Sequence, residues 1–181
     1  MAEPTYPDSD PIRENIEISK NNEILSYPVW CLDWRVVFDF SLHSLPNQTS
    51  SFLKISGHDE IDIDEKFDIL NVEILPQGSF KIRHFIDSKW TTEFSRAKSE
   101  FISETVDLDR KNTLEIRQII NWSERFNYRI ILNGRLVHHQ IFQTAKKFNF
   151  AKIWAGDDSD SFADAEINAL WVSPMENSGA V

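Results

Sequence analysis

Hydrophobic and polar residues alternate along most of the chain. A period of two is typical of a β-strand that has one face on a hydrophobic core and one face toward solvent. The alternation is clearest at residues 34–42, where the apolar side chains share one face: Trp34, Val36, Phe38, Phe40 and Leu42. This segment therefore predicts a half-buried strand.

A second alternating segment, residues 128–142, predicts a β-hairpin. Tyr128, Ile130 and Leu132 fall on one face, and Asn133-Gly134 follows them directly. Asn-Gly tolerates positive φ at both central positions, which a two-residue type I′ turn requires. We therefore expect two antiparallel strands on either side of this dipeptide.

Short strand-like runs account for most of the remaining chain, and we see no helix of ordinary length. These runs lie at about 15–19, 23–26, 51–55, 67–75, 80–86, 90–94, 114–122, 148–155 and 165–172. Residues 95–107 are ambiguous, and a helical turn is one option there. The pattern predicts an all-β fold, either a two-sheet antiparallel β-sandwich or a jelly roll. Phe38, Ile130 and Trp171 are expected to face its shared interior.

The length of 181 residues predicts one domain with short tails. We place a flexible lead-in at 1–14, a single domain at 15–173 and a C-terminal tail at 174–181. Hydrophobic residues make up 41% of the chain, with thirteen Phe and six Trp, which is enough for a sizeable core.

The net charge of −10 argues against nucleic acid and anionic membrane surfaces as partners. The chain has no apolar run long enough to insert into a membrane. No signal peptide is visible, which leaves the compartment open between an intracellular location, unconventional export and removal of a signal. The single cysteine, Cys31, excludes an intrachain disulfide. We expect a buried thiol there, with a reactive or intermolecular thiol as the alternative.

The C-terminal third resembles the closing strands of galectins and, more loosely, of concanavalin A-like lectins and laminin-G-type jelly rolls. The resemblance rests on an Asn133-Gly134 hairpin, a strand that ends at Phe142 and a Gly156-Asp157 turn. It implies a concanavalin A-like jelly roll, a glycan or glycoprotein as partner, and an extracellular or secreted location. It implies no particular oligomeric state.

The same resemblance implies a carbohydrate-binding site at Trp90, Glu93 and Arg96. In galectins a sugar ring stacks on the Trp of a W-x-x-E-x-R motif, and the charged residues bind its hydroxyl groups. Arg96 stands one place later than the motif requires, so strand alternation would turn it to the other face. A packed Trp beside a solvated Glu is the alternative interpretation.

We therefore expect a non-catalytic recognition module and no enzyme. An adhesion or structural sandwich that makes protein contacts without sugar is the first alternative. The second is a laminarinase-type retaining β-glucanase, because Glu60-Ile-Asp-Ile-Asp-Glu65 matches its E-x-D-x-x-E strand. With a β-bulge before Glu65, the carboxyl groups of Glu60 and Glu65 would lie about 5 Å apart. A solvated acidic loop is the simpler interpretation of this segment.

A second acidic segment makes Ca²⁺ a candidate cofactor. Its proposed ligands are the carboxylates of one loop: Asp157, Asp158, Asp160 and Asp164. Ca²⁺ prefers six to eight oxygen ligands, but the spacing is not that of an EF-hand, and an acidic turn is the alternative. His138 and His139 are adjacent on a predicted strand, so their rings should point to opposite faces and not share a metal.

Overall fold

The computed structural model of the chain describes residues 11–59, 64, 66–86, 97–121, 123, 125–143, 145, 147–156 and 161–175. These residues form β-strands joined by turns and loops. The strands are β1 (Arg13–Glu17), β2 (Glu23–Trp30), β3 (Asp33–Leu42), β4 (Ser50–Asp59), β5 (Lys66–Ile74), β6 (Ser79–Ile86), β7 (Ala97–Thr105), β8 (Lys111–Ile120), β9 (Phe126–Leu132), β10 (Arg135–Phe142), β11 (Phe148–Ala155) and β12 (Ala165–Met175).

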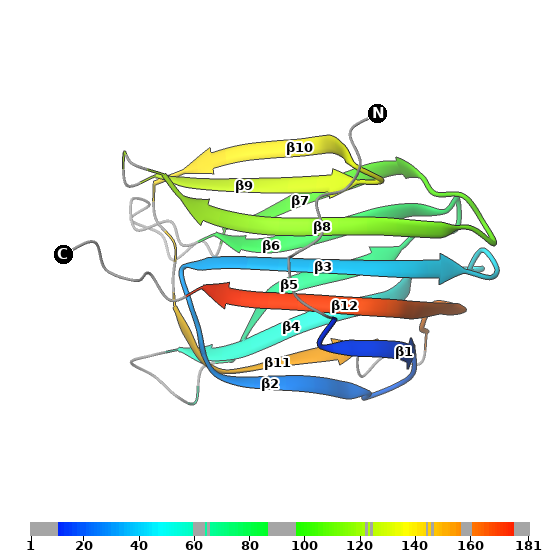
Figure 1. The fold of residues 1–181 in the computed structure, drawn as a ribbon, viewed down its shortest axis with the longest axis horizontal. Coiled ribbons are helices and arrows are strands. Elements are labelled where there is room, and N and C mark those ends of the chain that lie inside the picture. The colour runs from blue at the N-terminus through cyan, green and yellow to red at the C-terminus, as the bar shows by residue number, and fades with distance from the viewer. Residues whose placement is uncertain are drawn as a thin grey trace.

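The strands build two antiparallel sheets that lie face to face (Figure 1). Sheet A has the order β1-β12-β3-β8-β9-β10, and sheet B has the order β2-β11-β4-β5-β6-β7. The last two strands lie inside the sheets, because β12 pairs with β1 and β3 while β11 pairs with β2 and β4. The all-β, two-sheet sandwich predicted from sequence is confirmed.

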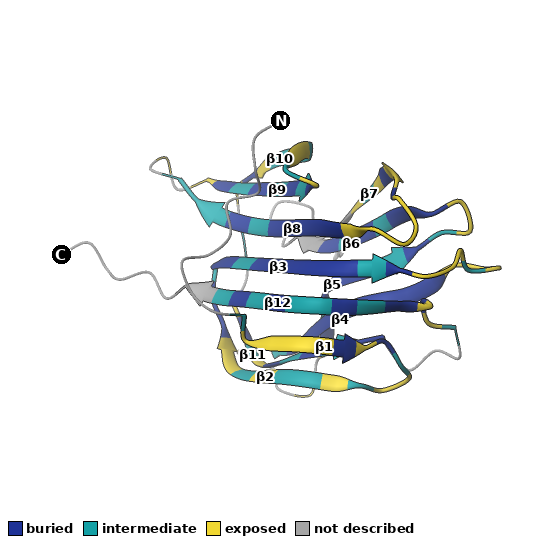
Figure 2. Cartoon of the chain, turned by 45° about the vertical axis from the view of Figure 1, so that its right-hand side comes forward, coloured by how far each residue is buried: buried dark blue, intermediate teal, exposed yellow. Residues whose placement is uncertain are grey.

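One hydrophobic core fills the space between the sheets, and the central strands are the most buried (Figure 2). The predicted inner face of β3 is correct, since Trp34, Val36, Phe38, Phe40 and Leu42 are all buried. Alternation places these side chains on the inner face, and their burial removes the apolar surface from water.

Aromatic rings form the centre of this core. The Phe52 ring lies 5.5 Å from Phe38, 5.2 Å from Phe40 and 5.3 Å from Phe80. Most of these pairs are edge-to-face, the geometry that the ring quadrupole favours. The four phenylalanines come from β3, β4 and β6, so they tie the two sheets together.

Two sequence expectations about the fold were wrong. Trp171 does not face the interior: it is half-buried and lies on the outer side of β12, opposite the buried Leu170 and Val172. The segment considered for a helical turn contains strand β7, which pairs with β6. Its exposed edge position explains the weak signal, because an edge strand needs few apolar residues. Phe38 and Ile130 are buried as predicted.

Glycine and asparagine occupy turn positions that require positive φ. Asn133 and Gly134 have φ of 50° and 75°, as the predicted hairpin turn requires. Gly78 has φ of 82° in the turn between β5 and β6, where its N–H donates to the Leu75 carbonyl at 2.8 Å. Across the described residues, no helix is long and apolar enough to span a membrane.

Candidate functional site

The outer face of sheet B brings together cationic and aromatic side chains from β4 and β11. Lys54 of β4 is paired with Trp154 of β11, and Ser56 is paired with Lys152. Residues two apart on a strand share a face, so these four side chains form two adjoining rows. We call this surface, with His58 and Phe150 at its end, the β4/β11 face.

Direct contacts hold the Trp154 indole in place on this face. Its Nε1–H donates to Ser56 Oγ at 3.3 Å, and Lys152 Nζ lies 5.6 Å from the ring centroid. Lys152 Nζ also donates to Glu23 Oε2 at 2.7 Å, which anchors the cation from the β2 side. A half-buried indole fixed in this way offers a flat surface on which a sugar ring can stack.

Phe150, four residues before Trp154 on β11, has an unusual backbone conformation. Its φ is 50°, where a bulky L-residue is rare, and its side chain is 52% exposed. The pairing of β11 with β4 shifts register between Asn149 and Lys152, so Phe150 lies in a β-bulge. Its ring centroid lies 6.4 Å from that of His58. Strained backbone of this kind is concentrated at functional sites.

A small hollow continues the β4/β11 face toward β6. It has a volume of about 60 Å³ and is lined by Asp68, Asn71, Arg83 and His84. Asp68 Oδ1 pairs with Lys54 Nζ at 3.2 Å, and Arg83 pairs with Glu73. The hollow therefore borders the two-row cluster directly.

The residues that line the hollow have polar atoms without protein partners. Asn71 Oδ1, Arg83 Nε and His84 Nδ1 are all buried and make no hydrogen bond within the described structure. Leaving buried donors and acceptors unpaired costs about 1–3 kcal/mol each. Arg83 Nε, a donor, and Asn71 Oδ1, an acceptor, belong to paired residues of β6 and β5, and such a combination suits a group that can use both, such as a sugar hydroxyl.

The buried network behind the hollow fixes the tautomer of His84. Gln118 Nε2 donates to the Leu32 carbonyl, so Gln118 Oε1 must accept from His84 Nε2 at 3.1 Å. Nδ1 is then a lone-pair acceptor. Burial lowers the pKa of His84 to about 3, and the neighbouring charge of His138 lowers it further, although the Gln118 bond opposes the shift. His84 is therefore a neutral imidazole at neutral pH.

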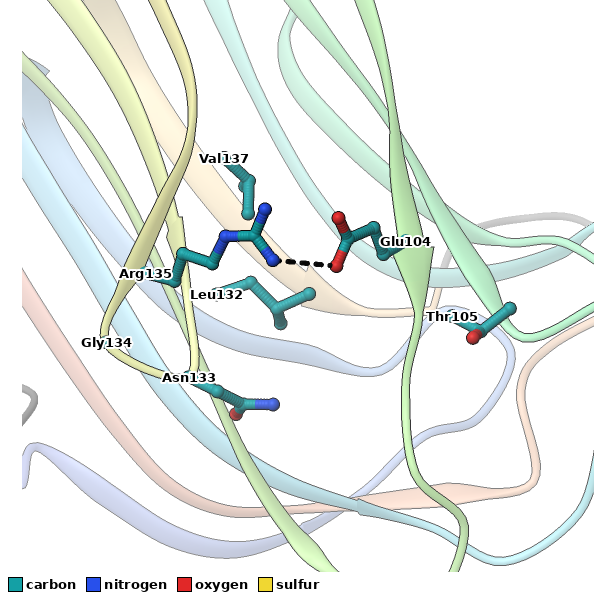
Figure 3. A pocket seen from close by; sticks show the side chains of 7 residues that line it. All are labelled: Glu104, Thr105, Leu132, Asn133, Gly134, Arg135 and Val137. Carbon is teal, nitrogen blue, oxygen red and sulfur yellow. Dashed lines mark hydrogen bonds and ion pairs between the residues drawn. The ribbon is translucent and has the colours of Figure 1, made fainter. Parts of the chain in front are cut away.

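A larger cavity of about 390 Å³ lies elsewhere, between the edge strands β7 and β10. Figure 3 shows Arg135 of β10 reaching toward Glu104 of β7, with Val137 above and Leu132 below the arginine side chain. The two charged groups are 3.2 Å apart and largely exposed, so the pair contributes little stability. The cavity has room for a ligand, but its one carboxylate, Glu104, is paired with Arg135, and no aromatic ring on which a sugar could stack is among its lining residues, so the β4/β11 face is the stronger candidate.

Similarity to known proteins is found only at the level of structure. No protein-family model and no curated protein sequence matches the chain. Among solved structures, endo-β-1,4-glucuronan lyase from the fungus Trichoderma reesei matches with a TM-score of 0.57 and 11% identity, over 77% of this chain and 67% of that one. Alginate lyase A1-II′, of polysaccharide lyase family 7, matches with a TM-score of 0.51 and 13% identity, over 84% and 64%.

A carbohydrate-binding domain matches over nearly the whole chain. It is the CBM40 of Ruminococcus gnavus IT-sialidase bound to α2,3-sialyllactose, with a TM-score of 0.54, 15% identity and 92% coverage of both chains. The fold is a jelly-roll β-sandwich. The similarity supports the concanavalin A-like architecture but not a galectin or laminin-G domain specifically. The chain spans about two thirds of the length of the lyases.

These neighbours correct one expectation. From sequence we expected a non-catalytic recognition module and no enzyme, but the structures above include two polysaccharide-degrading enzymes on this scaffold. The catalytic alternative is therefore better supported than the main interpretation. Its proposed residues, Glu60 and Glu65, lie outside the described residues, and the two enzymes named above are lyases and not glucanases.

The other predicted site residues are mostly untested. Trp90, Glu93 and Arg96 lie outside the described residues, and so do Asp157, Asp158 and Asp160. Asp164 is exposed, and its Oδ2 accepts from Ser44 Oγ at 2.6 Å. Within the described ranges, no three His, Cys, Asp or Glu side chains are grouped to hold a metal ion. Calcium at the acidic loop stays a prediction, which a rise in melting temperature with CaCl₂ would support.

Predictions for individual side chains are confirmed where the structure describes them. Cys31 is buried. The His138 ring lies 4.9 Å from the Phe101 ring between the sheets, whereas His139 Nε2 donates to Asn127 Oδ1 at 3.1 Å on the outer face. The two rings therefore point to opposite faces, as adjacent strand residues must.

Sequence reasoning missed the β4/β11 face. A signal was present, because Lys54, Ser56 and His58 alternate with apolar residues, as do Lys152 and Trp154. What could not be predicted was that β4 and β11, far apart in sequence, are neighbours in one sheet.

Proposed function

We propose that the protein cleaves an acidic polysaccharide by a lyase-type β-elimination on the β4/β11 face. The observation that carries this proposal is the combination of two lysines, a fixed indole and a hollow with unpaired polar atoms on one outer sheet face. Glucuronan and alginate, the polymers named for the neighbouring lyases, carry a carboxylate on each sugar. A glycan is accordingly the proposed partner.

The charges of the face favour a uronate over a neutral sugar. Lys54 and Lys152 lie on either side of Ser56, and each pairs with a carboxylate that is itself partly exposed. A substrate carboxylate can therefore compete for either ammonium group through a charge-assisted hydrogen bond. Trp154 lies between these lysines in the two-row cluster and would support the apolar side of the ring.

The reaction needs a cation, a base and a proton donor. The base removes the proton at C5, next to the carboxylate, and the C4–O bond breaks as a C4=C5 double bond forms. The departing glycosidic oxygen takes up a proton from solvent water, and the base later releases the C5 proton to solvent. A lysine that neutralises the carboxylate makes the C5 proton more acidic. We assign proton abstraction to His58, because histidine is the side chain that most often serves as a general base.

The test is turnover of glucuronan and alginate, measured by the ultraviolet absorbance of the unsaturated product. We expect wild-type protein to cleave at least one of these polymers. His58→Gln should lower kcat by about 10²- to 10⁴-fold, the range for loss of a general base. The matched control is His139→Gln, which removes an exposed imidazole on the other sheet and should leave kcat unchanged.

Two further variants separate binding from chemistry. Trp154→Ala should raise KM more than it lowers kcat, because stacking stabilises bound substrate and transition state alike. Lys152→Met should lower kcat as well, if its ammonium group neutralises the carboxylate. Absence of cleavage of either polymer by folded wild-type protein, or full activity of His58→Gln, would contradict the proposal.

A further inference from the structure

Three arginines form a straight row on the outer face of sheet A, the side of the sandwich opposite the β4/β11 face. Arg35 of β3 is paired with Arg117 of β8, and Arg117 is paired with Arg129 of β9. Their chain neighbours Trp34, Ile116 and Ile130 face the core, so alternation turns the three guanidinium groups outward. Neighbouring strands are about 4.8 Å apart, which sets the spacing along this arginine row.

The row has a surplus of positive charge. Glu115 is the carboxylate that binds it: Arg35 Nε and Nη2 donate to Glu115 at 3.0 and 3.1 Å, and Arg117 Nη1 lies 3.4 Å from the same group. Arg129 makes no ion pair with a carboxylate of the described residues. Among the ion pairs of the described residues, Glu115 thus serves two of the three guanidinium groups, and Arg129 is left over.

This arrangement is unfavourable for the protein alone. Like charges directly opposite each other on neighbouring strands destabilise a sheet, and the row contains two such pairs. Burial lowers the pKa of Arg117, and the charges of Arg129 and Arg35 act in the same direction, against the effect of Glu115. The Nε atoms of Arg117 and Arg129 are buried and have no hydrogen-bond partner within the described structure. An anion placed over the row would relieve the repulsion between the guanidinium groups.

We propose that the arginine row is a second, non-catalytic binding surface for the carboxylates of an acidic polysaccharide. The choice of ligand rests on the proposed function, which supplies the polymer. A guanidinium group binds a carboxylate through two parallel N–H donors, and a linear polyuronate laid across the strands would present successive carboxylates to the row. Such a surface would keep the polymer on the protein between cleavage events.

The surroundings of the row favour a carboxylate polymer over nucleic acid. Nucleic-acid binding requires many Lys and Arg residues over a wide area to displace counterions. Here the arginines lie beside the buried carboxylate of Glu115, and the whole chain is acidic. Trp171 lies on the same outer face, paired with Val37, within the neighbouring cross-strand row.

The variant that tests the proposal is Arg117→Gln/Arg129→Gln. It leaves the Arg35–Glu115 pair in place, so the buried carboxylate keeps its partner. The matched control, Arg110→Gln/Lys147→Gln, removes the same charge from exposed positions outside the row. Binding of long glucuronan and alginate chains is measured by calorimetry at two salt concentrations, and turnover is measured on short oligosaccharides of the same polymers.

We expect the arginine double variant to bind the long polymer roughly 10- to 100-fold more weakly, with a smaller salt dependence and unchanged turnover of short substrates. Equal polymer affinity of the two double variants would overturn the proposal. Tighter binding of poly-glutamate or single-stranded DNA than of either polyuronate at this row would also overturn it. Absence of turnover in the wild-type protein contradicts only the proposed function, because the binding comparison does not depend on catalysis.

Discussion

The two ends of the hydrophobic core are built differently. At one end, Phe38, Phe40, Phe52 and Phe80 pack ring against ring with no polar atom among their side chains. At the other end, aromatic rings surround a polar chain that runs from the Leu32 carbonyl through Gln118 to His84. The first end stabilises the sandwich. The second end contributes less stability, because it buries polar groups behind the hollow of the β4/β11 face.

The largest effect is expected at the phenylalanine end. Phe52→Ala removes the ring that contacts the other three and leaves a cavity in a fully buried site. We expect a loss of about 3–5 kcal/mol in the free energy of unfolding, measured by chemical denaturation. Phe162→Ala, at a 43% exposed position, is the control and should cost much less. Similar losses for both variants would show that the ring cluster is not the main source of stability.

The next effect concerns the polar chain at the other end. Gln118→Leu removes the acceptor of His84 Nε2–H and the donor to the Leu32 carbonyl, and leaves both groups buried. We expect a loss of about 2–3 kcal/mol in stability, from the cost of unpaired buried groups. Gln48→Leu is the control, at an exposed position in the loop before β4. Stability equal to that of the wild type would mean that the network contributes nothing.

The same end should make stability depend on pH. Unfolded His84 binds a proton near pH 6.5, whereas in the folded protein burial lowers its pKa to about 3. Between these values the unfolded state binds more protons, so stability falls as the pH falls. From pH 6.5 to 5 the loss is on the order of 2 kcal/mol. His84→Leu should flatten this part of the curve, and His139→Gln should not. A curve of unchanged slope in His84→Leu would contradict the assignment.

The smallest effect is expected at Tyr128. Its ring stacks on His84 with centroids 4.1 Å apart, but its hydroxyl is buried and has no hydrogen-bond partner within the described structure. Burial also raises the pKa of Tyr128. Tyr128→Phe keeps the stack and removes the unpaired group, so stability should stay the same or rise by up to about 1 kcal/mol. A loss above about 1 kcal/mol would reveal a hydrogen bond that the hydroxyl makes.

The comparison also shows what the sequence could predict. The phenylalanine end follows from alternation in β3, because every second residue must reach the core. The polar end does not, since His84 and Gln118 look like surface residues until β6 and β8 are known to lie in opposite sheets. Trp171 was misplaced for a related reason: a register shift between Ile167 and Ala169 decides which face of β12 it occupies.

The candidate site could not be predicted for the same reason, because the sequence does not reveal which strands are neighbours in a sheet. The side chains of β4 and β11 meet only through the order of strands in sheet B, which alternation within one strand does not reveal. The galectin-like resemblance identified the jelly roll but directed attention to Trp90, outside the described residues. A resemblance at the level of the fold therefore predicted the architecture but not the ligand-binding site.

The interleaved sheet order has a consequence for synthesis. Strands β11 and β12 are inserted between strands from the first third of the chain, so neither sheet can close until the C-terminal residues have left the ribosome. Pairing over such sequence distances makes folding slow, and the nascent chain exposes the unpaired edges of β2, β3 and β4 in the meantime. We expect a chain that ends after β10 to be insoluble, and the whole protein to depend on chaperones until its last strand is in place.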